Sequence, residues 1–112
     1  MSKLIGNDGE NQAKKYLKKI GYKIVRQNFF SRFGEIDIIA TDKNCTVFVE
    51  VKKRKSDLFD GGAAYVDKRK QRKIIKTAES YVIKNKLDGE MRFDVIEING
   101  DEINHIKNAF FS

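Results

Sequence analysis

The chain has 112 residues, is 40% apolar, and carries a formal net charge of +7 from 23 basic and 16 acidic side chains. This length predicts one domain over residues 1–112 with a single modest core. No apolar run or signal-peptide pattern suggests a membrane protein, and the lone Cys45 excludes an internal disulfide, so a cytoplasmic location is expected. The basic charge favours a polyanionic partner, most simply nucleic acid.

The first helix is expected over residues 7–20. Apolar side chains recur there at helical spacing: Ala13, Tyr16, Leu17 and Ile20. Glu10 lies one turn before Ala13, on the same inward face. Two interpretations of Glu10 stay open, because it can contribute to an interior site or complete a capping box with Asn7.

A first strand is expected over residues 22–29, at an edge of the sheet or on a partly covered face, and it is followed by a bend at residues 31–34. Three aromatic residues accompany it: Phe29, Phe30 and Phe33. We expect these rings to be buried, although exposed rings in this place would be able to stack on nucleobases.

The next two segments, residues 34–40 and 47–52, are predicted to form an antiparallel hairpin joined by a polar turn. Strand alternation gives this hairpin one apolar face. Its members are Ile36, Ile38, Ala40, Val47, Val49 and Val51. The opposite face gathers four charged side chains, namely Glu35, Asp37, Glu50 and Lys52.

The charged face of the hairpin predicts a metal site. Strands this rich in Val, Ile and Phe are typical of the buried centre of a sheet, where an unpaired charge costs several kcal/mol, roughly. Asp37 and Glu50 would repel each other there, and Mg²⁺ or Mn²⁺ bound by their hard oxygen ligands would relieve that repulsion. Lys52 is placed to orient a water or to stabilise a developing phosphate charge. The alternative is an ion pair between Glu50 and Lys52 on a solvated face.

Two basic clusters, residues 52–55 and 68–76, flank the acidic face in sequence. The loop expected over residues 55–66 is either a flap that contacts substrate or a plain connection. The second long helix is expected over residues 67–87, with Asp67 as its cap. Its buried stripe is Ile74, Ile75, Ala78, Tyr81 and Val82. Its basic residues either bind phosphate or form a solvated face.

A strand, an Asn-Gly turn and a closing strand or helix are expected over residues 92–110. His105, the one histidine of the sequence, is expected to be structural. Arg92 and Asp94 are expected to pair either with each other or with the acidic site.

The motifs Gly34-Glu35-Ile36-Asp37 and Glu50-Val51-Lys52 resemble the YraN-like family, and the resemblance runs over nearly the whole chain. Further residues that fit the family pattern are Gly9, Glu10, Gly21, Asn28, Arg54, Lys70, Ala78 and Asp94. These small bacterial proteins are assigned to the PD-(D/E)xK nuclease superfamily and are similar to archaeal Holliday-junction resolvases. The resemblance implies an α/β fold with a restriction-endonuclease-like core, a central mixed sheet flanked by helices in the order helix-strand-strand-strand-helix-strand.

The same resemblance implies roles for individual residues. Asp37 and Glu50 would bind the metal, Lys52 would act beside them, and a helical Glu such as Glu10 approaches the metal, whereas Glu35 is expected to support the site. Lys70 and Gln71 would contact substrate phosphate. The other residues expected in the nucleic-acid surface are Arg32, Lys53, Arg54 and Arg72. Family members often carry a basic residue where Phe30 stands, so either a phosphate contact is reduced here or Arg32 supplies it.

The leading functional hypothesis is a metal-dependent endonuclease that hydrolyses phosphodiesters in DNA, in particular branched or structured DNA. A homodimer is expected, because so small a chain needs a second copy to cut both strands of a junction. Two alternatives stay open: a non-catalytic nucleic-acid-binding protein with a vestigial site, and a basic domain that binds an acidic protein partner.

Overall fold

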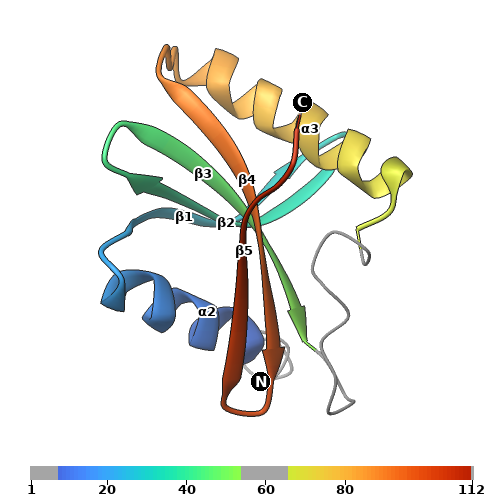
Figure 1. Cartoon of the computed structure of the whole chain (residues 1–112). Helices are drawn as coiled ribbons and strands as arrows, with labels where there is room; N and C mark the ends of the chain where they lie inside the picture. The colour runs from blue at the N-terminus through green and yellow to red at the C-terminus, as the bar shows by residue number, and fades with distance from the viewer. Residues whose placement is uncertain (1–7, 54–65, 112) are drawn as a thin grey trace.

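The computed structural model describes residues 8–53 and 66–111 (Figure 1). The elements are α2 (Asp8–Lys19), β1 (Lys23–Ser31), β2 (Gly34–Asp42), β3 (Cys45–Lys53), α3 (Lys68–Lys84), β4 (Glu90–Asn99) and β5 (Glu102–Phe110). Their order agrees with the predicted one, and the closing segment is a strand. The expected flap lies almost wholly outside the described residues, as do Asn7 and Arg54. Neither described helix is long and apolar enough to cross a bilayer.

The five strands form one mixed sheet in the order β1-β2-β3-β4-β5. Only β3 and β4 run parallel, because α3 carries the chain from the end of one to the start of the other. The helices α2 and α3 lie on opposite sides of the sheet (Figure 1). The α/β fold with a mixed central sheet flanked by helices is therefore as predicted.

Each helix covers its own apolar cluster. The cluster under α3 consists of Phe29, Ile36, Ile39, Phe48, Val66, Ile74, Ala78, Tyr81, Phe93, Val95 and Phe110. The cluster under α2 consists of Ala13, Leu17, Tyr22, Ile38, Ala40, Val47, Val49, Ile96 and Ile98. The alternation of β3 is as predicted, since Val47 and Val49 face α2 while Phe48 faces α3.

Strand β2 departs from the predicted alternation at Asp37. Ile38 and Ala40 pack under α2, but Ile36 packs under α3, on the face opposite to the expected one. The pairing of β2 with β3 ends at Ile38 opposite Val49. Beyond that point the Asp37 carboxylate accepts the backbone N–H of Val51 at 2.8 Å. A side chain therefore continues the contact between the strands and frees β2 to turn.

Three other details follow local chemistry. Asp67 caps α3 as predicted, because its side chain accepts the N–H of Lys70 at 2.8 Å. Ile20, expected in the buried stripe of the first helix, is 42% exposed because α2 ends before it. Burial was correctly predicted for Phe29, but Phe30 is 68% exposed because it follows Phe29 on an edge strand and points to the other side.

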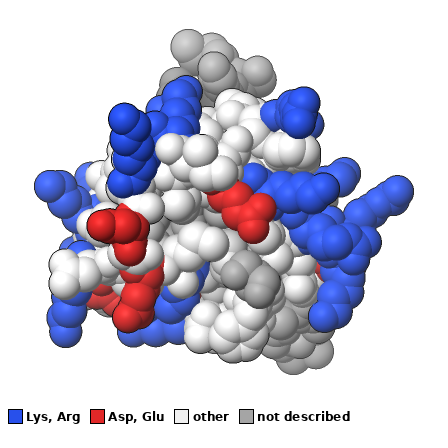
Figure 2. Space-filling view, turned by 90° about the horizontal axis from the view of Figure 1, so that it is seen from above, with Lys and Arg blue, Asp and Glu red and all other residues white. Residues whose placement is uncertain are grey.

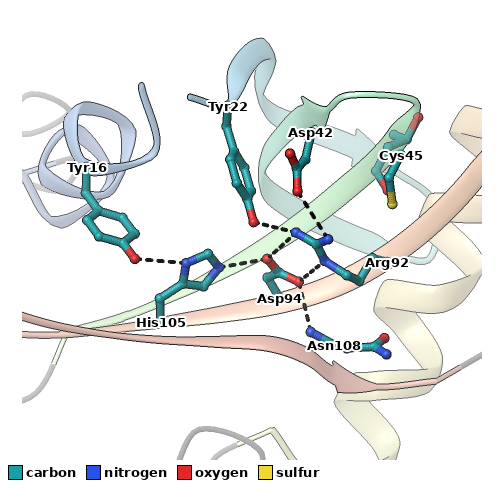
Figure 3. A network of polar contacts seen from close by, with 9 residues as sticks. Tyr16, Tyr22, Asp42, Cys45, Arg92, Asp94, His105 and Asn108 are labelled. Atoms are coloured by element: carbon teal, nitrogen blue, oxygen red, sulfur yellow. Dashed lines mark hydrogen bonds and ion pairs between the residues drawn. The ribbon is translucent and has the colours of Figure 1, made fainter. Parts of the chain in front are cut away.

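A buried polar network centred on Asp94 occupies the α2 side of the sheet (Figure 3). Its carboxylate accepts hydrogen bonds from Arg92 Nε at 2.9 Å and Nη2 at 3.2 Å and from the backbone N–H of Asn108 at 3.0 Å. His105 Nε2 lies 2.7 Å from Asp94 Oδ2. Arg92 and Asp94 thus pair with each other, on the face opposite α3, and His105 belongs to the same network.

The outer members of the network connect it to neighbouring elements (Figure 3). The Tyr16 hydroxyl on α2 contacts His105 Nδ1 at 3.0 Å. Arg92 also donates to the Tyr22 hydroxyl and, at 3.4 Å, to Asp42 at the end of β2. The network therefore joins α2, β2, β4 and β5 through polar side chains.

The pKa of Asp94 shows how well the network compensates its charge. Burial raises the pKa of this carboxyl, but hydrogen bonds from His105, Arg92 and Asn108 outweigh burial and hold the pKa below its ordinary value. A carboxyl whose pKa is lowered by folding stabilises the protein above its unfolded value of about 3.9. That contribution is lost as the pH falls through the folded value.

We expect Asp94→Asn to lower the free energy of unfolding by about 3–5 kcal/mol at pH 7, because it leaves the Arg92 guanidinium without its buried counter-charge. The matched control is Asp42→Asn, whose side chain is 29% exposed and makes one contact of 3.4 Å to Arg92. That control should cost less than about 1 kcal/mol. Urea titrations followed by circular dichroism measure both values, and equal losses would contradict a dominant role for Asp94.

Candidate functional site

Carboxylates converge where β2 separates from β3. Glu10 on α2 and Glu35 and Asp37 on β2 each offer an oxygen, and these three atoms lie within 4.8 Å of one another. The first turn of α2 packs against the end of β3, since a Cβ on Gly9 would lie in ordinary van der Waals contact, 3.7 Å from Lys53 Cδ and 3.9 Å from Val51 Cγ1. Glu10 therefore lies with the strand carboxylates, as the resemblance implied.

Glu50 adds a fourth carboxylate from β3. It is only 6% exposed, and it makes an ion pair with the Lys70 ammonium group on α3. One cavity of about 380 Å³ is lined by four of these charged residues, namely Glu35, Asp37, Glu50 and Lys70. Its other lining residues are Gly34, Asp67, Arg69, Lys73 and Ile74. We call these four carboxylates, Glu10, Glu35, Asp37 and Glu50, the acidic site.

The carboxylates of the acidic site repel one another, and this repulsion changes their pKa values. Burial and the neighbouring charge of Glu50 raise the pKa of Asp37 to about 8, although the N–H of Val51 acts in the opposite direction. Burial, Glu10 and Glu50 likewise raise the pKa of Glu35. The carboxyl groups of this site therefore keep their protons at pH values well above the ordinary titration range of carboxyl groups. A bound cation would replace these protons favourably.

Lys70 and Lys52 are two lysines that accompany Glu50. Lys70, expected to contact phosphate, pairs directly with Glu50. Burial lowers the pKa of Lys70, but the hydrogen bond to Glu50 outweighs it and raises the pKa overall. Lys52 is partly buried and lies two residues beyond Glu50, on the same face of β3. It is close enough to Lys70 to contribute to the raised pKa of Lys70.

Asn28 is a component that the sequence did not single out for this site. Its backbone adopts a positive φ of 55° inside β1, a conformation that Asn tolerates better than most residues. With its amide nitrogen directed toward the carboxylates, Asn28 donates to Glu10 Oε1 at 3.0 Å and to Glu35 Oε2 at 2.9 Å. The available signal was that Asn28 fits the pattern of the YraN-like family, which assigned it no role at the acidic site.

The residues expected to bind nucleic acid fall into two groups. Arg32 and Arg72 are exposed and line a second cavity of about 410 Å³. Lys53 is exposed at the end of β3. Gln71 turns back to its own helix, where its side-chain N–H donates to the Val66 carbonyl at 2.7 Å. In the view from above, Lys and Arg side chains gather on the side where α3 begins (Figure 2).

The donor set of the acidic site suits a hard divalent cation. Asp37 and Glu50 offer carboxylate oxygens at the junction of β2 and β3, with Glu10 and Glu35 beside them. Mg²⁺ and Mn²⁺ prefer such oxygen ligands and retain several waters, which the cavity of about 380 Å³ has room for. The convergence of Glu10, Glu35 and Asp37 oxygens within 4.8 Å favours this fit, and the direction of the Asp37 pKa shift agrees with it.

The fold and this site define a small basic α/β protein with a carboxylate cluster at the end of its central hairpin. The chain belongs to the uncharacterised protein family UPF0102, which its residues 9–98 match. It is 49% identical over 107 residues to a UPF0102 protein of Thermodesulfovibrio yellowstonii, with 96% of each chain covered. It is 48% identical over 106 residues to one of Persephonella marina, covering 94% of this chain and 91% of the relative.

In metal-free buffer, we expect the protein to lose stability as the pH rises from about 4 toward 8, because unfolding lets Asp37 ionise at its ordinary pKa. Asp37→Asn keeps an acceptor for the Val51 N–H but cannot ionise. Between pH 5 and pH 8.5, its melting temperature should therefore fall less than that of the native protein, and the two decreases should differ by about 5 °C or more. Thermal unfolding with EDTA measures this difference.

The control for this pH effect is Asp88→Asn, at an exposed position near the other end of the sheet. It should follow the native pH dependence. If the stability of the Asp37→Asn protein depends on pH as that of the native chain does, Asp37 is not the group that causes the loss of stability at high pH.

Proposed function

We propose that this protein is a metal-dependent endonuclease that hydrolyses phosphodiester bonds in DNA, in particular branched or structured DNA. One observation carries the proposal: Glu10, Glu35 and Asp37 converge within 4.8 Å, and Glu35, Asp37 and Glu50 line a cavity that is bordered by cationic side chains of α3. Acidic groups of this kind suit a metal, and the cations beside them suit the phosphate backbone that the metal would act on.

Asp37 and Glu50 would hold Mg²⁺ or Mn²⁺, with Glu10 as a further ligand or as an acceptor for a metal-bound water. When bound, such an ion supplies an activated water and a Lewis acid for the scissile phosphate. Asn28 would fix the orientation of Glu10 and Glu35 through its two amide hydrogen bonds. The Val51 N–H would hold Asp37 in place.

The cationic side chains would act on the substrate. Lys52 would orient the attacking water or stabilise the charge that develops on the phosphoryl oxygens. Lys70, which pairs with Glu50, would be close enough to contact the same phosphate. Arg32, Arg72 and Lys53 would hold neighbouring phosphates, so binding should weaken steeply with salt.

The resemblance of the two strand motifs to PD-(D/E)xK nucleases supports this proposal. So does the topology, in which α3 crosses between the parallel strands β3 and β4 and places its basic first turns beside the acidic site. A restriction-endonuclease-like core is the corresponding proposal for the fold. A homodimer would present two such sites to the two strands of a branched substrate.

We expect the native protein to nick four-way-junction DNA in Mg²⁺ or Mn²⁺, and Glu50→Gln and Lys52→Met to reduce the nicking rate by at least about 100-fold, the usual scale for losing a transition-state contact. Binding in EDTA should persist in both variants, because neither replacement removes the basic surface. Gel assays with duplex, single-stranded and junction DNA measure the rates and affinities.

The matched controls are Glu90→Gln and Lys43→Met, two exposed positions at the opposite end of the sheet, and both should cut at the native rate. Cleavage that survives Glu50→Gln and Lys52→Met refutes these catalytic roles. A native protein that binds DNA but never cuts would support a non-catalytic nucleic-acid-binding protein. A protein without salt-sensitive nucleic-acid binding would point to an acidic protein partner.

A further inference from the structure

Phe30 is an exposed aromatic ring at the edge of the acidic site. Its exposed fraction is 68%, which is high for so large an apolar side chain. It pairs directly with Glu35 across the β1–β2 ladder. Side chains that oppose each other in an antiparallel ladder project to the same side with their Cβ atoms about 5 Å apart. The ring therefore lies beside a carboxylate of the acidic site.

A cationic cavity of about 410 Å³ adjoins the acidic site on its other flank. Among the described residues it is lined by Arg32, Phe33, Arg69, Arg72, Lys73 and Lys76, none of which is acidic. The Arg32 guanidinium carbon lies 5.0 Å from the centre of the Phe33 ring, and Lys76 Nζ lies 5.4 Å from it. The ring thus positions two cations that no carboxylate in this lining neutralises.

The two flanks are continuous with the acidic site. Arg69 and Lys73 line both the acidic cavity and the cationic cavity, and Glu35 links the acidic cavity to Phe30. The cations from Arg69 to Lys76 extend for about 10 Å along α3 at the helical rise of 1.5 Å per residue. An aromatic ring, a carboxylate cluster and a row of cations therefore follow one another across this edge of the molecule.

We propose that this strip binds a single unpaired nucleic-acid strand, with one base stacked on Phe30 and the following phosphates in the cationic cavity. Both parts are needed for that ligand: a π-face for a base and cations for the backbone. A base inside a duplex offers no free face for stacking, so Phe30 selects for nucleotides that are unpaired next to the acidic site. The inference deepens the proposed function by naming its substrate class, and it depends on nucleic-acid binding but not on cleavage.

The charge pattern distinguishes this occupant from an apolar protein partner. Phe30 is a single exposed ring beside Glu35, and the cavity beyond the acidic site is cationic rather than apolar. A partner that buries one ring and neutralises several cations within about 10 Å has the chemistry of a nucleotide strand. An apolar helix or a second copy of this basic chain would leave those cations uncompensated.

The test measures affinity for a single-stranded oligonucleotide and for a duplex of equal length, in EDTA so that no cutting occurs. Phe30→Ala should weaken single-strand binding about 5- to 100-fold, the loss of one base–aromatic stack, and leave duplex binding within about twofold. The chain contains no tryptophan. Phe30→Trp therefore introduces a single tryptophan, which can be excited separately from the tyrosines; it should keep the affinity and be quenched by the single strand.

The matched controls are Phe111→Ala and Phe111→Trp, because Phe111 is 74% exposed and follows the end of β5, where Phe110 pairs with Phe93 far from the acidic site. Neither control should change single-strand affinity or report binding by quenching. Lys76→Met should reduce the slope of log affinity against log salt by about 0.7 for the single strand. Lys84→Met, in the last turn of α3, should leave that slope unchanged.

Each outcome decides between this inference and the proposed function. Native single-strand affinity in Phe30→Ala, or an equal loss in Phe111→Ala, overturns the strip even if the protein proves to be an endonuclease. Stacking on Phe30 without any cutting supports the strip while the endonuclease proposal fails. A protein that binds neither single strand nor duplex overturns both.

Discussion

The hydrogen bond from the Val51 N–H to the Asp37 carboxylate is the interaction on which the rest of the site depends. It lies where β2 stops pairing with β3, and it joins the diverging strands through a side chain instead of the backbone. This bond holds Asp37 close to Glu10, Glu35 and Glu50 despite their mutual repulsion. The apolar clusters on both sides of the sheet supply the free energy that keeps these like charges together.

Asp37 and Asp94 carry the same chemical group in opposite electrostatic environments of one sheet. Asp94 is fully buried, but Arg92, His105 and the Asn108 N–H satisfy it, and its pKa is lowered. Asp37 meets other carboxylates and a single backbone donor, and its pKa is raised to about 8. A charge compensated within the protein stabilises the fold, whereas an uncompensated charge beside a cavity favours an external cation. The network around Asp94 therefore acts within the fold, whereas the candidate site takes carboxylates from α2, β2 and β3 and opens toward α3.

The sequence predicted most of the fold because each element carries its own local signal. The alternation of Val47, Phe48 and Val49 predicted a strand with two distinct faces, and the cap at Asp67 marked the start of α3. The predictions for Ile36 and Phe30 were wrong for different reasons. Periodicity assumes an unbroken ladder, and the divergence of β2 at Asp37 places Ile36 on the other face. Phe30 directly follows the buried Phe29 on β1, so strand alternation turns its ring away from the cluster that buries Phe29.

By itself, the sequence determined the fold class, the order of the elements and the charged residues that alternation places on one face of the central hairpin. Only the tertiary structure decided that Lys70 pairs with Glu50 and that Asn28 contacts two of the carboxylates. These contacts join α2, β1, β2, β3 and α3. Spacing along the chain reports only which face of its own element a side chain occupies, whereas such contacts depend on how the elements pack against one another.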